Sequence, residues 1–196
     1  YLPYMGFREF GDRCDALGNL LAVVLDVAEP EQANRVLDYM AATGLDAPYP
    51  VRALDRPIFP ADRDWREYYR LRHLNLPHQY HNGGIWPFVG GFWAMALALA
   101  GKEDTARQEL AKLAQVCSLD DWRFTEWFHG QTLQPMGMAG QSWFQSLIVS
   151  TQGPWNAEAI VAGKARIDDA KMTGITPPVL TFSGMCVLEP PYIRRP

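Results

Sequence analysis

The sequence predicts an all-α fold, in which helical hairpins form part of a toroid with long functional loops and a short extended or β tail. Apolar residues recur at helical spacing along three successive pairs of segments, and in each pair the first segment is the more apolar. A repeated inner apolar helix and outer amphipathic helix is typical of hairpins arranged around an axis. We therefore expect a partial toroid over residues 1–166 and an extended tail over 167–196.

The first hairpin is defined by its capping residues. Helical apolar spacing predicts the inner helix over 15–28, and Asp15 is placed to cap its N-terminus. Pro30 suits the first turn of the outer helix, which is expected to run through Met40 and to stop at Gly44.

The second and third hairpins repeat this plan. The segment 86–100 is apolar on nearly every side, which predicts a buried helix, whereas 102–116 has one apolar face and predicts a surface helix. A third pair is expected over 141–150 and 155–166, separated by the break at Gly153-Pro154.

Two long connections, 45–84 and 119–140, join the hairpins. They are rich in Trp, Tyr, Pro, His and charged residues. Connections of this length inside a compact domain are usually functional, so candidate site residues are sought there.

Composition excludes several classes of protein. The 196 residues are 48% hydrophobic and 20% charged, which is the profile of a globular domain. The net charge of −4 and the scattered basic residues predict no nucleic-acid partner, and the longest apolar run, 88–100, is too short to span a bilayer. Cys14, Cys117 and Cys186 are far apart and odd in number, which predicts no disulfide framework and favours the cytoplasm. No cofactor is expected.

The run from Tyr80 to Pro87 has the composition of a sugar site. His81 and Asn82 can both donate and accept hydrogen bonds, as sugar hydroxyls require, and Trp86 offers a flat ring for the apolar face of a sugar. The two glycines between them permit a close approach of the backbone. The alternative is an ordinary tight turn before a buried helix.

Glu126 is the candidate catalytic acid or base. Aromatic residues surround it in the second connection, and aromatic neighbours desolvate a carboxylate as acid–base chemistry requires. The alternative is a structural surface glutamate. His73, His78 and His81 do not have the spacing of a standard zinc motif, so no metal site is expected.

Three runs of sequence, in this order and at these separations, resemble the C-terminal half of the (α/α)6-barrel glycoside hydrolases. They are GDRCDALGNLLAVVLDVA, DWREYYRLRHLNLPHQYHNGGIWPFVGGFWAMALALAG and FTEWFHGQTLQPMGMAGQSW. The resemblance is to the bacterial amylo-α-1,6-glucosidase or glycogen-debranching-like proteins and to the related alkaline/neutral invertases.

The resemblance implies roles for individual residues. Glu126 matches the general base that activates water in an inverting hydrolysis, and Asp15 matches a residue with a supporting role at the top of an inner helix. The family's general acid lies on an earlier hairpin. The residues expected to bind substrate are His81, Asn82, Trp86, Trp127, His129, Gln141, Trp143 and Asp15.

These matches predict a debranching-like hydrolase that cleaves an α-glucosidic linkage in an oligosaccharide or disaccharide. One alternative is an invertase that cleaves sucrose, although the invertases have a Tyr-Tyr-Asp type sequence around their base, whereas this chain has Glu126-Trp127-Phe128-His129. Another is a non-catalytic, carbohydrate-binding half-barrel that lacks the general acid. We expect another chain or a missing N-terminal half to complete the barrel.

Overall fold

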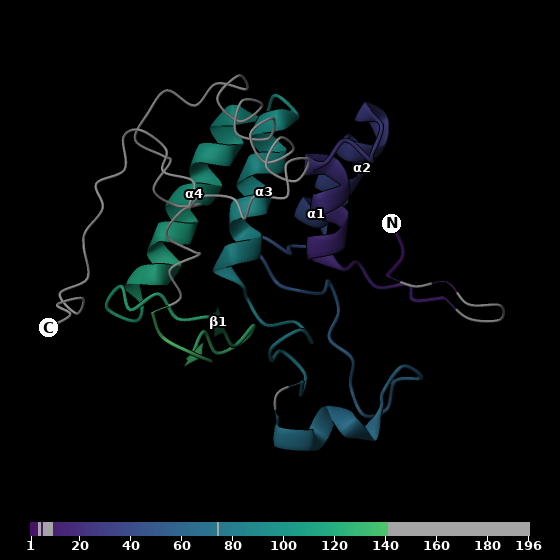
Figure 1. The fold of residues 1–196 in the computed structure, drawn as a ribbon, viewed down its shortest axis with the longest axis vertical. Coiled ribbons are helices and arrows are strands. Elements are labelled where there is room, and N and C mark those ends of the chain that lie inside the picture. The colour runs from purple at the N-terminus through teal and green to yellow at the C-terminus, as the bar shows by residue number, and fades with distance from the viewer. Residues whose placement is uncertain (4, 6–9, 74, 141–196) are drawn as a thin grey trace, which may run out of the picture.

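The computed structural model describes residues 1–3, 5, 10–73 and 75–140. This part of the chain is mostly helical (Figure 1). Its elements are the α-helices α1 (Ala16–Val24), α2 (Pro30–Ala42), α3 (Pro87–Leu99) and α4 (Glu103–Ser118), the 3₁₀ helix η1 (Glu67–His73), and the strands β1 (Trp127–Phe128) and β2 (Pro135–Met136). The predicted third hairpin and the tail lie outside the described residues.

The first hairpin confirms the capping predictions. The Asp15 carboxylate accepts a hydrogen bond from the backbone N–H of Gly18, and Pro30 is the first residue of α2. Gly44, with φ +65°, follows the C-cap of α2. The predicted inner helix was too long, because α1 ends at Val24 and the next residues turn back to bond the Ala22 carbonyl.

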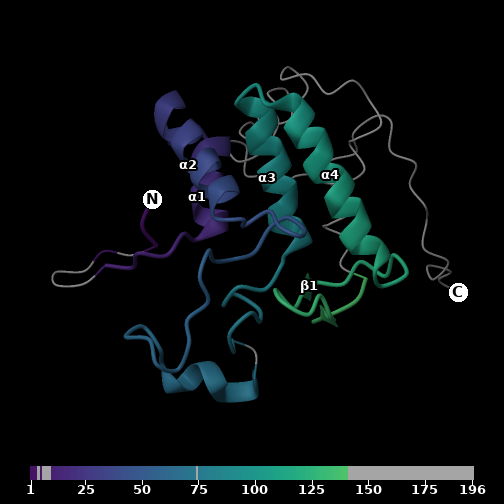
Figure 2. The same ribbon diagram turned by 180° about the vertical axis from the view of Figure 1, so that it is seen from behind.

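The second hairpin confirms the contrast between a buried and a surface helix. Helix α3 lies between α1 and α4 (Figures 1 and 2) and buries residues around its whole circumference. Trp86 is its N-cap rather than its first residue. Helix α4 buries one face, which includes Ala106, Leu110 and Leu113, and turns the other to solvent.

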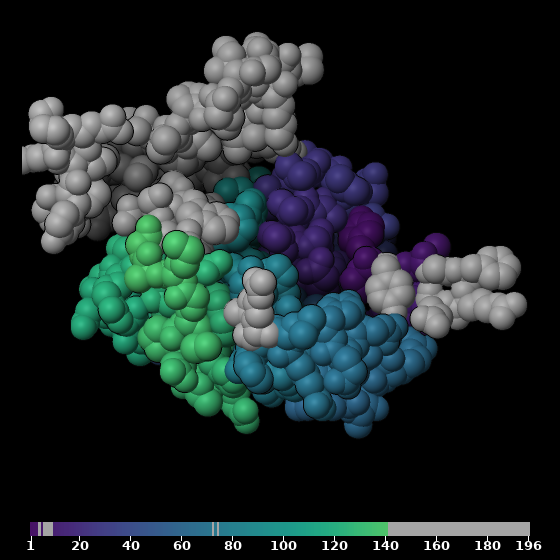
Figure 3. Space-filling view, turned by 60° about the horizontal axis from the view of Figure 1, so that its bottom comes forward, coloured from purple at the N-terminus to yellow at the C-terminus, as the bar shows by residue number. Residues whose placement is uncertain are grey.

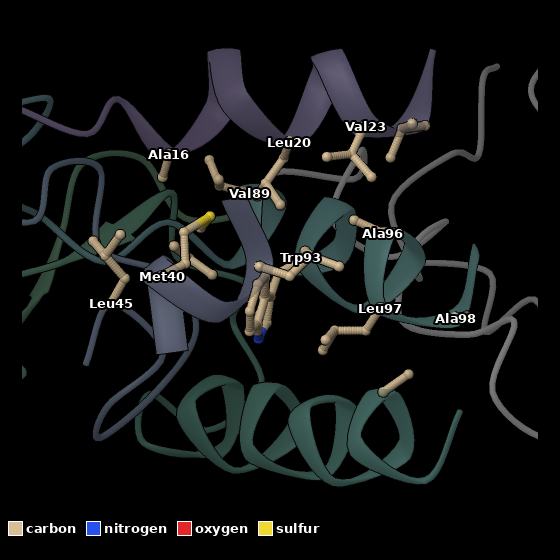
Figure 4. Packing of buried hydrophobic residues seen from close by; sticks show 14 of the residues in the cluster. Ala16, Leu20, Val23, Met40, Leu45, Val89, Trp93, Ala96, Leu97 and Ala98 are labelled. Carbon is tan, nitrogen blue, oxygen red and sulfur yellow. The ribbon is translucent and has the colours of Figure 1, made fainter. Parts of the chain in front are cut away.

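The core forms where helices α1, α2 and α3 meet. Leu20 of α1, Met40 of α2 and Trp93 of α3 are almost completely buried in one cluster (Figure 4). Burial of each such side chain contributes about 1.5–3 kcal/mol. The helices therefore form a stiff frame, and the two long connections leave it at the end where α1 and α3 begin (Figure 1). In the described part of the chain, no helix is long and apolar enough to cross a membrane.

A series of short backbone bridges crosses this end of the molecule. Asp15 pairs with Leu54, Arg52 pairs with Ile85, and Ile85 pairs with Phe128, all antiparallel. Strand β1 then pairs with β2. The bridges join the start of α1, both long connections and the start of α3, and so they place the candidate residues of distant segments in one row.

Candidate active site

Glu126 lies just before β1, in a hairpin that holds its carboxylate in place. The backbone N–H of Glu126 donates to the Met138 carbonyl at 2.9 Å, and the Met138 N–H donates to the Glu126 Oε2 at 3.1 Å. The side chain is half-buried. One carboxylate oxygen is thus fixed by the backbone of the opposite arm of the hairpin.

Gly137 is the residue that makes room for this contact. It has φ +77°, and a Cβ added there would lie 2.5 Å from the Glu126 Oε2 and 2.8 Å from the Trp127 Nε1. Only glycine satisfies both the backbone conformation and the space. The glycine therefore lets the carboxylate lie directly against the backbone.

The segment before Glu126 is held by a small polar network. Arg123 forms an ion pair with Asp120, and the buried Thr125 hydroxyl donates to the same carboxylate. The hydrogen bonds from Arg123 and Thr125 lower the pKa of Asp120 below its ordinary value. Asp120 thus remains charged and fixes the segment that leads into the hairpin.

His81 belongs to a stack of rings at the start of α3. Its imidazole lies parallel to the Tyr80 ring with the centroids 4.2 Å apart, and the Trp86 indole N–H donates to the Tyr80 carbonyl at 3.0 Å. A second edge of Tyr80 meets Trp127 of β1, at 5.9 Å. The His81 ring is exposed to solvent, whereas Trp86 is buried beneath it.

Asp15, His81 and Glu126 converge electrostatically. Desolvation by the surrounding protein lowers the pKa of the His81 imidazole, and the negative charges of Asp15 and Glu126 oppose that shift. Both carboxylates are therefore close enough to act on the same imidazole, although they lie on segments more than a hundred residues apart in the sequence. A neutral imidazole can both donate to and accept from sugar hydroxyls.

Asn82 is committed to the protein itself. Its Oδ1 accepts from the Ile58 N–H, and its Nδ2 donates to the carbonyls of Ile58 and Asn75, at 2.6 to 3.0 Å. The residue is 4% exposed. The side chain is thus occupied by Ile58 and Asn75, whereas a direct sugar contact was expected from its chemistry.

Trp86 and Trp127 are buried as well, at 6% and 1% exposure. Each supports the ring stack from below instead of presenting a free face, which corrects the expectation that their rings are accessible to a sugar. Gln141 and Trp143 lie outside the described residues.

His129 follows β1 and faces the first connection. Its Nδ1 accepts from the N–H groups of Gln131 and Thr132, and its ring lies 6.0 Å from that of His78. Desolvation lowers the pKa of both imidazoles, and the neighbouring His129 lowers that of His78 further.

Tyr80 and Gly137 are two site residues that sequence reasoning missed. The local sequence gives only weak signals for them: the Tyr comes directly before a His-Asn-Gly-Gly run, and the Gly lies between two Met residues. Each contacts a partner in the other connection or in the opposite arm of the hairpin, and the local sequence does not show that contact. Of the two predicted glycines, Gly83 has the expected positive φ, +93°. Gly84 makes room for the protein's own backbone, since a Cβ there would lie 2.7 Å from the Tyr80 carbonyl oxygen.

Within the described residues, no three His, Cys, Asp or Glu side chains gather as a metal site. A cavity of about 490 Å³ lies elsewhere, between the first residues of the chain and helices α1 and α2. Its lining does not include Glu126 or His81, so it is separate from the candidate site.

Comparison with known proteins places these features in a family. The family model described as alkaline and neutral invertase matches residues 5–151. The alkaline/neutral invertase E of Arabidopsis thaliana, a chloroplastic protein, is 29% identical over 126 residues, which is 61% of this chain and 18% of the relative. The mitochondrial neutral/alkaline invertase 1 of rice (Oryza sativa subsp. japonica) is 27% identical over 176 residues, 88% of this chain and 25% of the relative. A third relative, also from rice, is named cytosolic invertase 1.

A solved structure shares the fold. The GH63 mannosylglycerate hydrolase of Thermus thermophilus, in complex with Tris and D-glycerate, superimposes with a TM-score of 0.50 at 20% identity. The match covers 72% of this chain and 31% of that one. This agrees with the predicted partial toroid.

The chain thus spans a quarter or less of the length of the two invertases above. Since the family model matches three quarters of the sequence, this chain belongs to the alkaline and neutral invertase family of glycoside hydrolases.

Proposed function

We propose that this chain carries the base-bearing part of an active site that hydrolyses an α-glucosidic linkage with inversion. The observation that supports the proposal is the position of Glu126. Its half-buried carboxylate is fixed by the Met138 N–H, and the next residue, Trp127, meets the Tyr80 ring on which the His81 imidazole stacks. A carboxylate held beside an exposed hydrogen-bonding ring suits a general base that faces a sugar.

The chemistry requires one carboxylate on each side of the sugar. Glu126 takes a proton from water as that water attacks the anomeric carbon, while a carboxylic acid on the opposite side protonates the departing oxygen. Because the Glu126 Oε2 is bonded to Met138, we assign the water to Oε1. His81 binds a hydroxyl group of the sugar, and Asp15 supports the orientation of His81.

The general acid is proposed to come from outside the described residues. The Asp15 carboxylate is engaged as the cap of α1, where it accepts from the Gly18 N–H. The carboxyl groups of an inverting pair lie about 6.5–9.5 Å apart, so that the water fits between them. A second chain or a preceding part of the same protein is expected to place the acid there.

Sucrose is the first substrate to test, because it contains an α-glucosidic linkage and the relatives are named invertases. The replacement of the Tyr-Tyr-Asp type sequence had argued against sucrose. However, Trp127 and Phe128 of this segment are buried, so their side chains present little surface to a substrate. The debranching-type linkage remains the second substrate.

The test is turnover of sucrose, maltose and isomaltose by the protein and by its Glu126→Gln variant, with saccharide binding measured in parallel. We expect glucose release to fall by about 10³-fold while binding persists, because general base catalysis contributes on the order of 10²–10⁴-fold. Asp104→Asn, at an exposed position of α4, is the matched control and should not alter the rate. Turnover by Glu126→Gln at the wild-type rate would contradict the proposal. Binding without turnover in the unsubstituted protein would mean that this chain holds a half-site, whose general acid must be sought on another polypeptide.

A further inference from the structure

Residues 58–73 project from the end of the molecule where the candidate site lies (Figure 1). Asn82 closes the neck of this loop, since its side chain bonds both Ile58 and Asn75. We call residues 58–73 the aromatic loop, because Phe59, Trp65, Tyr68 and Tyr69 lie in it.

The backbone around Phe59 is fixed from two directions. Asn82 holds Ile58, and the Asp62 carboxylate accepts from the Phe59 N–H at 2.9 Å. Asp62 is in turn paired with Arg13, at 2.8 Å, in the segment that leads into α1. Phe59 is therefore attached to the frame and does not depend on its own side chain for its position.

Despite this rigid backbone, the Phe59 ring is 44% exposed. An aromatic ring buries a large apolar area when it meets a partner, and a preorganised backbone reduces the entropy that binding costs. A flat, exposed ring on a fixed backbone is thus suited to stack on the apolar face of a sugar.

Phe59 is also linked to the hairpin that carries Glu126. Its ring meets His78 edge-on at 5.9 Å, and His78 lies 6.0 Å from His129, three residues after Glu126. The Gly130 N–H donates to the His78 carbonyl at 2.8 Å. Figure 3 shows the same relationship, with the lobe formed by the first connection (blue) beside the segment that bears Glu126 (green).

We infer that Phe59 is the platform for a second sugar ring, next to the sugar that Glu126 attacks, and that Asn82 is the residue that positions it. The inference rests on the proposed function for the location of the first ring. The ligand class is a saccharide of two or more rings, of which Phe59 binds the ring beyond the scissile bond. A single ring occupies the His81 site and does not reach Phe59.

The experiment compares one-ring and two-ring ligands in the Glu126→Gln background, where no turnover disturbs the titration. Glucose, sucrose and maltose are titrated into the protein with and without Phe59→Ala. We expect the affinity for the two-ring sugars to fall about tenfold, the loss of one aromatic contact, with glucose affinity unchanged. Leu71→Ala is the matched control, because Leu71 is an apolar residue of the same loop that is 69% exposed.

The inference would be overturned if Phe59→Ala lowered the affinity for glucose as much as that for the two-ring sugars, or lowered neither. It would also be overturned if Leu71→Ala caused the same loss of affinity. Absence of sucrose and maltose binding would overturn it too. The proposed function is judged separately, by turnover in the unsubstituted background, where Phe59→Ala should raise KM without lowering kcat. Wild-type turnover by Glu126→Gln, together with binding that depends on Phe59, would sustain the inference and reject the proposed role of Glu126.

Asn82→Asp tests the positioning role. The variant keeps an acceptor for the Ile58 N–H but loses both donors to the carbonyls of Ile58 and Asn75. We expect trypsin to cleave the aromatic loop after Arg63, Arg66 or Arg70, and the affinity for two-ring sugars to fall selectively, as in Phe59→Ala. Loop cleavage without a selective affinity loss would reduce Asn82 to a purely structural residue and contradict this part of the inference.

Discussion

Ile85 and Phe128 exchange two backbone hydrogen bonds, each 2.8 Å long. This pair joins the loop that carries His81 to the hairpin that carries Glu126. Both side chains are completely buried, so the junction is shielded from water. The distance between the candidate base and the candidate sugar-binding ring is therefore set by backbone pairing in the core and does not depend on flexible side chains at the surface.

Replacement of Gly137 by alanine should impair the site and destabilise the hairpin. The added Cβ meets the Glu126 carboxylate, and a non-glycine residue at positive φ costs about 1–2 kcal/mol. We expect a loss of turnover greater than the loss of stability explains. Gly101→Ala is the control, since Gly101 has φ +74° but an added Cβ there meets no described atom within 4 Å. The role of Gly137 would be contradicted if both variants lowered turnover equally, with the rate expressed per folded molecule.

Arg13 should contribute more to stability than a typical surface arginine. It pairs with Asp62 and Asp64 at 2.8 and 2.6 Å, and its side chain is 13% exposed. Arg13→Met should lower the free energy of unfolding by on the order of 2 kcal/mol, because Asp62 loses its cationic partner and Asp64 loses the shorter of its ion pairs, keeping that with Arg63 at 3.5 Å. Arg35→Met removes only an exposed pair with Glu31 and should cost less than about 0.5 kcal/mol. Urea denaturation measures the free energy of unfolding of both variants. An equal loss in the two variants would show that Arg13 stabilises the protein no more than an exposed arginine does.

Because His78 lies beside His129, we expect the free energy of unfolding to decrease in mild acid. Desolvation, the neighbouring His129 and Arg52 lower the pKa of His78 in the folded protein, whereas the unfolded chain retains the ordinary value. The unfolded state therefore binds protons first as the pH falls, so stability is full above about pH 6.5 and declines below it.

Urea midpoints between pH 7.5 and pH 5 measure this effect. His78→Gln should flatten the profile, because the His78 Nδ1 has no hydrogen-bond partner among the described residues and its protonation is what opposes folding. His73→Gln, which replaces an exposed histidine of η1, serves as the control and should leave the profile unchanged. A profile that stays as steep in His78→Gln would assign the decline to other groups.

Local sequence patterns predicted the helices well. The apolar spacing of α1 and α3, the Asp15 cap and the stop at Gly44 depend on neighbours within a few residues, so the sequence contains enough information to place them. The end of α1 was missed because the chain turns back to Ala22 before the apolar pattern ends.

The site was predictable only in part. Residue type and family resemblance made Glu126 and His81 candidates. Their convergence depends on bridges between Asp15, Leu54, Ile85 and Phe128, which are far apart in the sequence. Asn82 was expected to contact a ligand, but its side chain bonds Asn75 and Ile58, the latter also distant in the sequence. Long-range pairing of this kind leaves no local pattern.

Chemical rescue of Glu126→Ala tests the central claim most directly. If Glu126 is the general base, the variant should be inactive on sucrose or maltose in water, and added azide should restore turnover, since this small anion needs no deprotonation to attack. The glucosyl azide should have the inverted, β configuration. An active Glu126→Ala variant without azide, or an azide product of α configuration, would contradict the assignment of Glu126 as the base of an inverting hydrolysis.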